Sequence, residues 1–297
     1  MSNPPRPGDT NRITREYMDS LLIATSYIDA VIPDTTFHLY GHSFKTPIMT
    51  AAFSHLDRFR ENGMAETAKG AKAAGAVMWA GWGSDEELKQ MTNTGAKVIK
   101  IEKPLADSDE IFRRMAVAEQ CGCIAFGIDT DHSFNNKGEY DEIRGTKMTG
   151  MSSEDIRQLV NAAKLPFIIK GVLSVKDALK CVDIGVKGIV VSHHSGKMDY
   201  VVPPLLVLPD IVKAVGGKLD IFVDCSIYSG YDAFKAIALG ANAVSFGRTM
   251  LASLTEKGAD GVYEVLTTAT AQLAGAMART ASPDIKSIDS AVIHRLR

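Results

Sequence analysis

Short apolar segments recur along the chain between residues 47 and 248, and stretches with helical spacing separate them. Near-continuous apolar runs of this kind are typical of strands that are covered on both faces, as in a parallel sheet. The eight segments begin at Pro47, Ala76, Lys97, Cys123, Pro166, Gly188, Asp220 and Asn242. The pattern therefore predicts a buried parallel sheet of eight strands.

The stretches between these segments have the spacing of one apolar helix face. After a possible cap at Ser152, apolar residues follow the i, i+3, i+4, i+7 series Ile156, Leu159, Val160 and Ala163. The same spacing recurs after Ser174 and within residues 234–241. Strands that alternate with helices predict a (β/α)8 TIM barrel more simply than a doubly wound sheet, and no Gly-rich dinucleotide fingerprint follows the first strand.

The length of the chain fits one such barrel with a short extension. The sequence has 297 residues, and a (β/α)8 barrel takes roughly 250. We assign residues 1–46 to an N-terminal cap segment and residues 47–297 to the barrel domain. The long polar loop 130–151 is the expected mobile lid.

Composition narrows the classes of partner. The formal net charge is −2 and no basic block is present, which argues against nucleic acid. No apolar run approaches the roughly 20 residues that span a bilayer, and the start "MSNPPRPGDTNR" lacks the apolar core of a signal peptide. Four cysteines are too few for a disulfide scaffold. We expect a cytoplasmic protein with reduced thiols that acts on a small molecule.

The strand ends carry the candidate chemistry, because active sites of (β/α)8 barrels lie at the carboxyl ends of the strands. The segment "GIVVSHHSGKMD", residues 188–199, ends an apolar strand on adjacent histidines. Other polar residues that end strands are Ser54, His55, Lys100, Glu102, Asp129, Asp131, Lys170, Ser192, Asp224 and Arg248. These groups are predicted to meet at one mouth of the barrel.

Three segments carry motifs of a known family. Residues 192–198, "SHHSGKM", are similar to a motif that reads roughly S-N-H-G-G-R-Q, and "IIKGVLSVKDA" resembles a segment with a K-G pair. Residues 208–248, "LPDIVKAVGGKLDIFVDCSIYSGYDAFKAIALGANAVSFGR", resemble the last two barrel strands of the same family. The family is that of the FMN-dependent 2-hydroxy-acid oxidases and dehydrogenases, which includes glycolate oxidase, lactate oxidase and flavocytochrome b2.

The resemblance implies a role for each matching residue. His194 is then the proton acceptor, Asp129 the carboxylate that orients it, and Lys170 the cation beside the flavin. These roles agree with the chemistry of imidazole and ammonium groups. The implied FMN contacts are Ala52, Lys100, Lys170, Ser192, Asp224, Ser226, Gly247 and Arg248, and the implied substrate contacts are Glu102, Lys197 and His194. The resemblance also implies a homotetramer.

The departures from the family pattern concern the substrate and the phosphate. Lys197 stands where the family has an arginine, so a forked carboxylate contact is lost. Lys100-Ile101-Glu102 replaces the Q-x-Y of the third strand, and "DCSIY" (residues 224–228) replaces D-G-G-x-R. We therefore expect weak FMN binding and poor activity on glycolate and lactate, with a preference for a donor group toward Glu102. Pairing of Lys100 with Glu102 would cancel that preference.

Other functions remain open from the sequence. The barrel could use FMN in a non-redox role, or act without flavin as a lyase or isomerase with Lys170 as a Schiff-base lysine. It could also bind a ligand without turnover. Asp129, Asp131, His132 and His194 lack a recognised metal-binding spacing, so we predict no metal.

Overall fold

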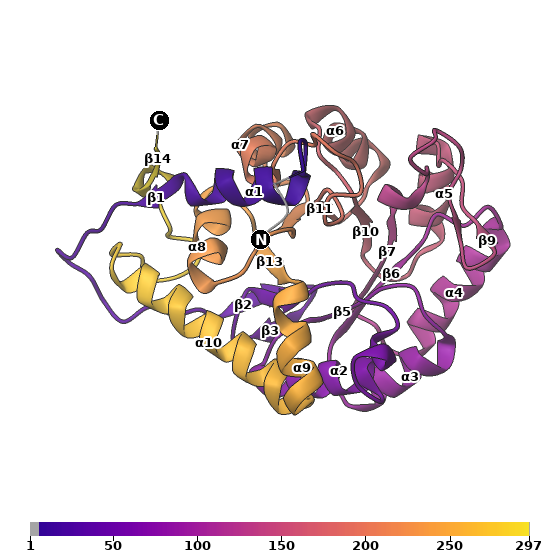
Figure 1. The fold of residues 1–297 in the computed structure, drawn as a ribbon, viewed down its shortest axis with the longest axis horizontal. Helices are drawn as coiled ribbons and strands as arrows, with labels where there is room; N and C mark the ends of the chain where they lie inside the picture. Colours follow the sequence, from indigo (N-terminus) through magenta and orange to yellow (C-terminus); the bar gives the residue numbers. More distant parts are fainter. Residues whose placement is uncertain (1–5, 297) are drawn as a thin grey trace.

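The computed structural model describes residues 6–296, and a parallel eight-stranded sheet forms its centre (Figure 1). The strands, in the order in which they neighbour one another, are β4 (Ile48–Thr50), β13 (Ala243–Phe246), β12 (Asp220–Val223), β11 (Gly188–Val191), β10 (Phe167–Lys170), β7 (Ala125–Asp129), β6 (Val98–Glu102) and β5 (Met78–Ala80). A bridge between Phe53 and Ala80 and a bond from Thr50 N to Val77 O (3.2 Å) close the ring. The predicted TIM barrel is confirmed, with every strand where the apolar pattern put it.

Helices cover the outside of the barrel and begin in a common way. The side chains of Ser84, Asp107, Ser152, Ser174 and Ser229 each accept a bond from the backbone N–H three residues later. Such caps satisfy N–H groups that lack a partner inside the helix. The helices are α2 (Gly63–Ala74), α3 (Asp85–Asn93), α4 (Ser108–Gln120), α5 (Ser153–Ala162), α6 (Val175–Ile184), α7 (Pro204–Val215), α8 (Gly230–Ala238), α9 (Leu251–Lys257) and α10 (Ala259–Ala278).

Side chains alternate between two apolar cores along each strand. One core lies between strands and helices. The other fills the barrel with residues such as Trp79, Ile99 and Phe222. The β2–β3 hairpin (Phe37–Leu39 and His42–Phe44) adds Phe37, Leu39 and Phe44 to the inner core. The hairpin therefore closes the end of the barrel opposite the mouth.

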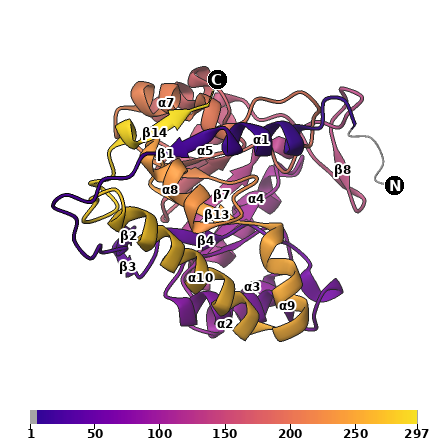
Figure 2. The same ribbon diagram turned by 60° about the vertical axis from the view of Figure 1, so that its left-hand side comes forward.

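The first helix lies at the mouth instead. α1 (Thr10–Asp19) is followed by β1 (Leu21–Ile23), which pairs antiparallel with β14 (Ile293–Arg295), as Figure 2 shows. The Thr10 hydroxyl donates to Met198 O (2.6 Å), in the loop that follows β11. The cap segment thus contributes to both ends of the barrel, and the domain division at residue 46 stays a prediction.

The loop after β7 has structure that the sequence did not reveal. It contains the short helix η2 (Thr130–His132) and the β8–β9 hairpin (Glu142–Ile143 and Thr146–Lys147). Ala106 N donates to Lys147 O (2.9 Å) and Thr149 N to Pro104 O (2.8 Å), which ties the hairpin to the loop after β6. Its mobility as a lid stays a prediction.

Membrane insertion through a helix has no support in the described part of the chain. Across residues 6–296, no helix combines the length and the apolar character that crossing a bilayer requires.

The hairpin that closes the barrel offers a test of the inner core. Phe37 is 4% exposed and packs in the inner core, so Phe37→Ala should lower the free energy of unfolding by about 3–5 kcal/mol. His38→Ala, on the exposed face of the same strand, should change it by less than about 0.5 kcal/mol. Urea unfolding measures both, and equal midpoints for the two variants would contradict this packing.

Candidate active site

Four strands of the barrel bring polar side chains together at the mouth. Asp129 ends β7, Lys170 ends β10, Ser192 follows β11 and Asp224 follows β12. Because the strands are parallel, their carboxyl ends lie at one edge. The Lys170 ammonium lies 3.3 Å from Asp129 Oδ1, 3.0 Å from Asp131 Oδ2, 3.4 Å from Ser192 Oγ and 4.0 Å from Asp224 Oδ2. The predicted residues at these strand ends therefore form one cluster.

Lys170 is the cationic centre of this cluster. Its side chain is buried, which would favour the neutral amine. The carboxylates of Asp129, Asp131 and Asp224 outweigh burial and hold the pKa of Lys170 well above its ordinary value. The site therefore presents a fixed positive charge at the base of the mouth.

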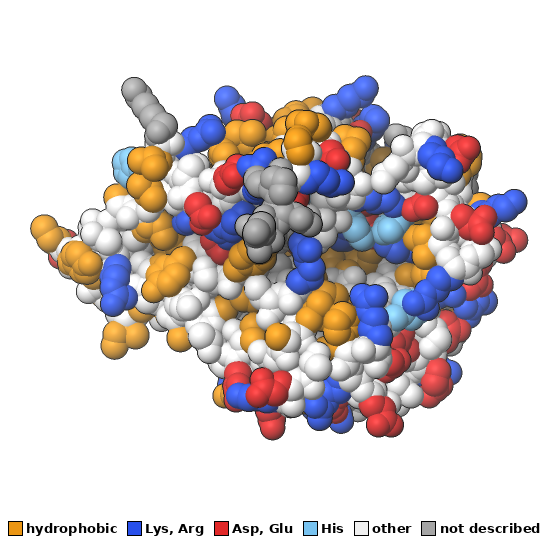
Figure 3. Space-filling view, in the orientation of Figure 1, with side chains coloured by type: hydrophobic (Ala, Val, Ile, Leu, Met, Phe, Trp, Pro, Cys, Tyr) orange, Lys and Arg blue, Asp and Glu red, His pale blue; other side chains and the backbone are white. Residues whose placement is uncertain are grey.

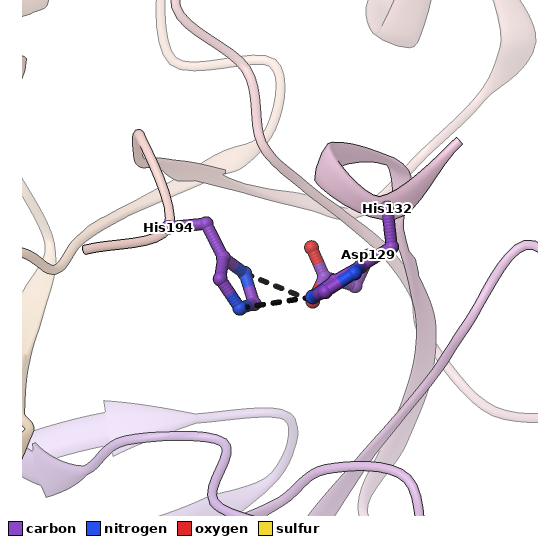
Figure 4. A group of neighbouring side chains, drawn as sticks. All are labelled: Asp129, His132 and His194. Carbon is purple, nitrogen blue, oxygen red and sulfur yellow. Dashed lines mark hydrogen bonds and ion pairs between the residues drawn. The ribbon is translucent and has the colours of Figure 1, made fainter. Parts of the chain in front are cut away.

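His194 presents one nitrogen to this cluster and the other to the loop after β7 (Figure 4). Its Nδ1 lies 3.2 Å from Asp129 Oδ2 and 2.9 Å from Lys170 Nζ. We assign the proton to Nδ1, since the Asp129 carboxylate can only accept. Burial and Lys170 act to lower the pKa of His194, but Asp129 and Asp131 outweigh them and raise it. Nε2 is then the nitrogen that can exchange a proton with a ligand.

Two residues near the base were not singled out as site residues from the sequence. Lys103 Nζ lies 2.7 Å from Asp129 Oδ2, on the side of the carboxylate away from Lys170's contact with Oδ1. Burial raises the pKa of Asp129, but Lys170, Lys103 and His194 together hold it well below the ordinary value. Asp141 lies beside Lys197. The signal for Lys103 was its position two residues beyond Ile101, on the inward-facing side of β6.

His132 completes the group drawn in Figure 4. Its Nε2 lies 3.1 Å from His194 Nε2, and the ligand atoms of Asp129, His132 and His194 all lie within 4.8 Å of one another. This spacing could suit a metal ion. However, the ammonium groups of Lys103 and Lys170 lie 2.7 and 3.3 Å from Asp129, and their charge disfavours a cation there. The absence of a metal stays a prediction.

The register of β6 argues against two predicted contacts. Ile99 and Ile101 point into the barrel, so Lys100 and Glu102 point to the helix layer. There Lys100 lies 2.8 Å from Glu102, and Arg114 of α4 lies 3.5 Å from the same carboxylate. Both residues are buried. The predicted FMN contact of Lys100 and substrate contact of Glu102 are therefore not placed at the mouth, because a shift of one residue moves a side chain to the other face.

A cavity adjoins the cluster on the side of β12, β13 and β4. Its volume is about 140 Å³, and it opens to solvent. Its wall contains predicted FMN contacts, namely Ala52, Lys170, Asp224, Ser226, Gly247 and Arg248. The Ser226 hydroxyl is buried without a partner, and a Cβ built at Gly247 would meet nothing closer than 4.0 Å. An unpaired donor and free space at the strand ends fit the phosphate and ring system of FMN.

The loop after β12 keeps the backbone of a glycine turn without glycine. Cys225 and Ser226 have φ values of 70° and 57°, in the left-handed region. The Cys225 thiol donates to Asp224 Oδ1 (2.9 Å) and accepts from Ser195 N (3.5 Å). Burial and then Asp224 raise the pKa of the thiol, so Cys225 stays protonated. The residue joins the cavity wall to the loop that carries His194.

The space-filling view of the molecule, in the orientation of Figure 1, shows histidine side chains beside lysine and arginine side chains (Figure 3). The face that carries the mouth thus combines groups that transfer protons with groups that attract anions. A (β/α)8 barrel with such a mouth defines the class of protein as an enzyme.

Comparison with known proteins identifies the family. The model of the FMN-dependent dehydrogenase family matches residues 6–151 and 142–295. The chain is 28% identical to the peroxisomal (S)-2-hydroxyacid oxidase GLO3 of Arabidopsis thaliana, over 88% of this chain and 81% of the relative. It is 28% identical to glycolate oxidase of Spinacia oleracea over 80% and 74%. It is 34% identical to L-lactate oxidase of Nostoc sp. over 57% and 46%.

Solved structures agree with this assignment. A mandelate oxidase with a bound difluorinated 2-hydroxy acid superposes with a TM-score of 0.88 at 25% identity, covering 97% of this chain and 90% of that one. A mandelate oxidase variant with a monooxide FMN adduct gives 0.86 at 25% identity, over 99% and 94%. The chain therefore belongs to the FMN-dependent dehydrogenase family and is an FMN-dependent oxidoreductase of the 2-hydroxy-acid oxidase type.

The position of Glu102 gives a direct test of the β6 register. Glu102→Gln should lower the free energy of unfolding by about 3–5 kcal/mol, because it leaves Lys100 buried beside a neutral amide. The Kd for FMN and the KM for substrate should stay within about twofold, since the side chain lies outside the mouth. Thermal unfolding and flavin titration measure these quantities. A large change in KM with unchanged stability would indicate that Glu102 lies in the substrate pocket.

Proposed function

We propose that this enzyme oxidises a small 2-hydroxy acid at the carboxyl end of its barrel, with His194 as the proton acceptor. Bound FMN supplies the acceptor for the hydride that leaves the α-carbon. The observation that supports this reaction is the His194–Asp129–Lys170 cluster next to the cavity of β12, β13 and β4. The base and the cation line this cavity, and the carboxylate that orients the base contacts both of them.

His194 removes the hydroxyl proton in this proposal. Its Nδ1 is held by Asp129, so Nε2 is the atom that accepts the proton. The resulting imidazolium is stabilised by the Asp129 carboxylate, which is itself kept ionised by two lysines. Asp129 therefore orients His194 and stabilises the charge that develops on it.

Lys170 and the cavity wall hold the cofactor. The Lys170 ammonium lies where a negative charge on a reduced cofactor ring would be stabilised. In this proposal Ser226, in the loop after β12, and Arg248, after β13, contact the phosphate, and Ala52, Ser192, Asp224 and Gly247 make the remaining contacts. Their support is that all of them except Ser192 line the cavity. Arg248 donates to Asn11 Oδ1 (3.0 Å) of α1 here, so the first helix also helps to position the phosphate site.

The substrate proposal differs from the expectation drawn from the sequence. Glu102 lies outside the mouth and is paired with Lys100, so the repulsion expected for a carboxylate loses its basis. Lys197 remains as the cation for the substrate carboxylate. Simple 2-hydroxy acids are therefore the proposed substrate class.

The alternatives open from the sequence are less well supported. A Schiff-base lysine must reach its neutral form, and three carboxylates keep the Lys170 pKa well above its ordinary value. A flavin-free lyase or isomerase is thus not favoured. A binding protein without turnover would have no use for a base oriented by a carboxylate.

A cytoplasmic location and a homotetramer complete the proposal. The first is supported by the composition of the chain, and the second by the family resemblance.

The role of His194 predicts a loss of turnover without loss of cofactor. His194→Gln should slow reduction of bound flavin by about 10²–10⁴-fold, because no group then accepts the hydroxyl proton. The flavin spectrum and FMN titration should stay close to wild type. Anaerobic bleaching with glycolate and lactate measures the rate, and His38→Gln at the far end of the barrel is the control. Undiminished bleaching in His194→Gln, or a wild type that binds no added FMN, would contradict the proposal.

The raised pKa of His194 predicts the pH dependence. The base must be unprotonated to accept a proton, so kcat/KM should fall as the pH drops through a pKa above the ordinary value of about 6.5. Asp129 is one of the groups that raise this pKa. Asp129→Asn should therefore move the acid limb to lower pH and reduce kcat. If the acid limb of the kcat/KM profile does not move in this variant, Asp129 does not raise the pKa of His194.

A further inference from the structure

The carboxylate of Asp141 contacts Lys197, the cation that is proposed to bind the substrate carboxylate. Asp141 Oδ2 lies 2.7 Å from Lys197 Nζ and 3.2 Å from His132 Nδ1. Lys197 and His132 also lie close together, with 2.7 Å between Nζ and Nδ1. A neutral His132 has one N–H, and its contact with His194 Nε2 places that N–H on Nε2. His132 Nδ1 then accepts from Lys197, and Lys197 is the donor to Asp141.

His132 also lies directly in front of the base. His132 Nε2 lies 3.1 Å from His194 Nε2, the nitrogen assigned to accept the hydroxyl proton. Their rings meet edge to face, with centroids 4.4 Å apart. In a 2-hydroxy acid the hydroxyl and the carboxylate are on adjacent carbons, so a hydroxyl at His194 Nε2 brings the carboxylate to this neighbourhood.

We propose that Asp141 occupies the carboxylate-binding position at Lys197 when no substrate is present, and that the carboxylate of the substrate displaces it. The inference rests on the proposed function and names the group that competes with the substrate. Substrate and Asp141 then compete for the same ammonium. Neither His132 nor Asp141 belongs to the motifs that placed His194 and Lys170.

His132 restrains the cation that stands in place of the forked arginine. An ammonium is a point charge, and it fixes one direction of a carboxylate poorly. Burial, Lys103 and His194 lower the pKa of His132 to about 4, so the ring is neutral near neutral pH and has one N–H. That N–H is on Nε2 and points to His194 Nε2, whereas Nδ1 accepts from Lys197. Lys197 provides the charge, and His132 holds its ammonium in place.

Asp141 and the substrate carboxylate carry the same charge, so they compete for Lys197. With Asp141 in place, the Lys197 charge is neutralised, and a second carboxylate nearby is repelled. Burial acts to raise the pKa of Asp141, but its contacts with Lys197 and His132 lower it, so the carboxylate stays ionised. Binding of the substrate carboxylate therefore requires displacement of Asp141.

Displacement needs only a rotation of the side chain. Asp141 N donates to Ser133 O (3.1 Å), and Asp141 O accepts from Met148 N (2.8 Å). Glu142 N donates to Asp141 Oδ1 (3.0 Å). The backbone is thus held at both groups, whereas the carboxylate can turn toward solvent, since its side chain is 18% exposed.

Removal of the Asp141 charge tests the competition. Asp141→Asn keeps the shape of the side chain and frees the Lys197 charge. We expect a KM for glycolate or lactate about three- to tenfold lower, with kcat changed by less than about twofold. Glu142→Gln removes the exposed neighbouring charge as the matched control and should leave both constants unchanged. An unchanged or higher KM in Asp141→Asn, or an equal decrease in Glu142→Gln, would overturn the proposal.

A binding measurement separates this proposal from the proposed function. Oxalate perturbs the spectrum of bound flavin, or releases heat, when it occupies a carboxylate site, and it requires no turnover. Its Kd should fall about three- to tenfold in Asp141→Asn and rise by at least a similar factor in Lys197→Met. A wild type that binds oxalate but does not oxidise any 2-hydroxy acid would refute the proposed function alone. Oxalate binding that is insensitive to both variants would refute the carboxylate site alone.

Discussion

The candidate site depends on one buried carboxylate, Asp129. It lies at the end of β7 between Lys103, Lys170 and His194, and none of these charges is stable alone in a buried environment. Two lysines keep the carboxylate ionised, and the ionised carboxylate in turn keeps Lys170 charged and His194 basic. The chemistry proposed for the mouth is therefore a property of the group as a whole. Loss of any one member would leave the others as uncompensated buried charges.

The barrel supplies the geometry that this group requires. Eight parallel strands end at one edge, so Asp129 and His194, more than sixty positions apart in sequence, meet within hydrogen-bond distance. The hairpin of residues 37–44 fills the opposite end with aromatic side chains. The mouth is thus open on one side only, and both cofactor and substrate must reach the cluster from there.

The loops on this mouth carry what distinguishes the chain from the family pattern. The loop after β12 adopts the left-handed conformation of a glycine turn with Cys225 and Ser226. The loop after β7 adds His132 and Asp141 beside Lys197, where the family has an arginine. The barrel is retained, whereas the cation proposed for the substrate carboxylate is paired with groups of another loop. Such a change alters specificity without altering the strands, because loops tolerate substitution better than a packed barrel does.

The sequence by itself determined the barrel and the polar residues at its strand ends. Apolar runs and helix caps are local signals, so the strands, the caps at Ser84, Ser152 and Ser174, and the position of Asp129, Lys170 and His194 at the mouth could be predicted from them. The roles proposed for these three residues come from the family resemblance. Only the tertiary structure decided which face of β6 looks into the barrel, because a period of two leaves the choice to packing and removes Lys100 and Glu102 from the mouth. It also decided the partners of Lys197, since His132 and Asp141 approach it from a loop more than fifty residues away in sequence. Long-range contacts of this kind depend on how the loops fold over the mouth, and no local pattern in the chain encodes them.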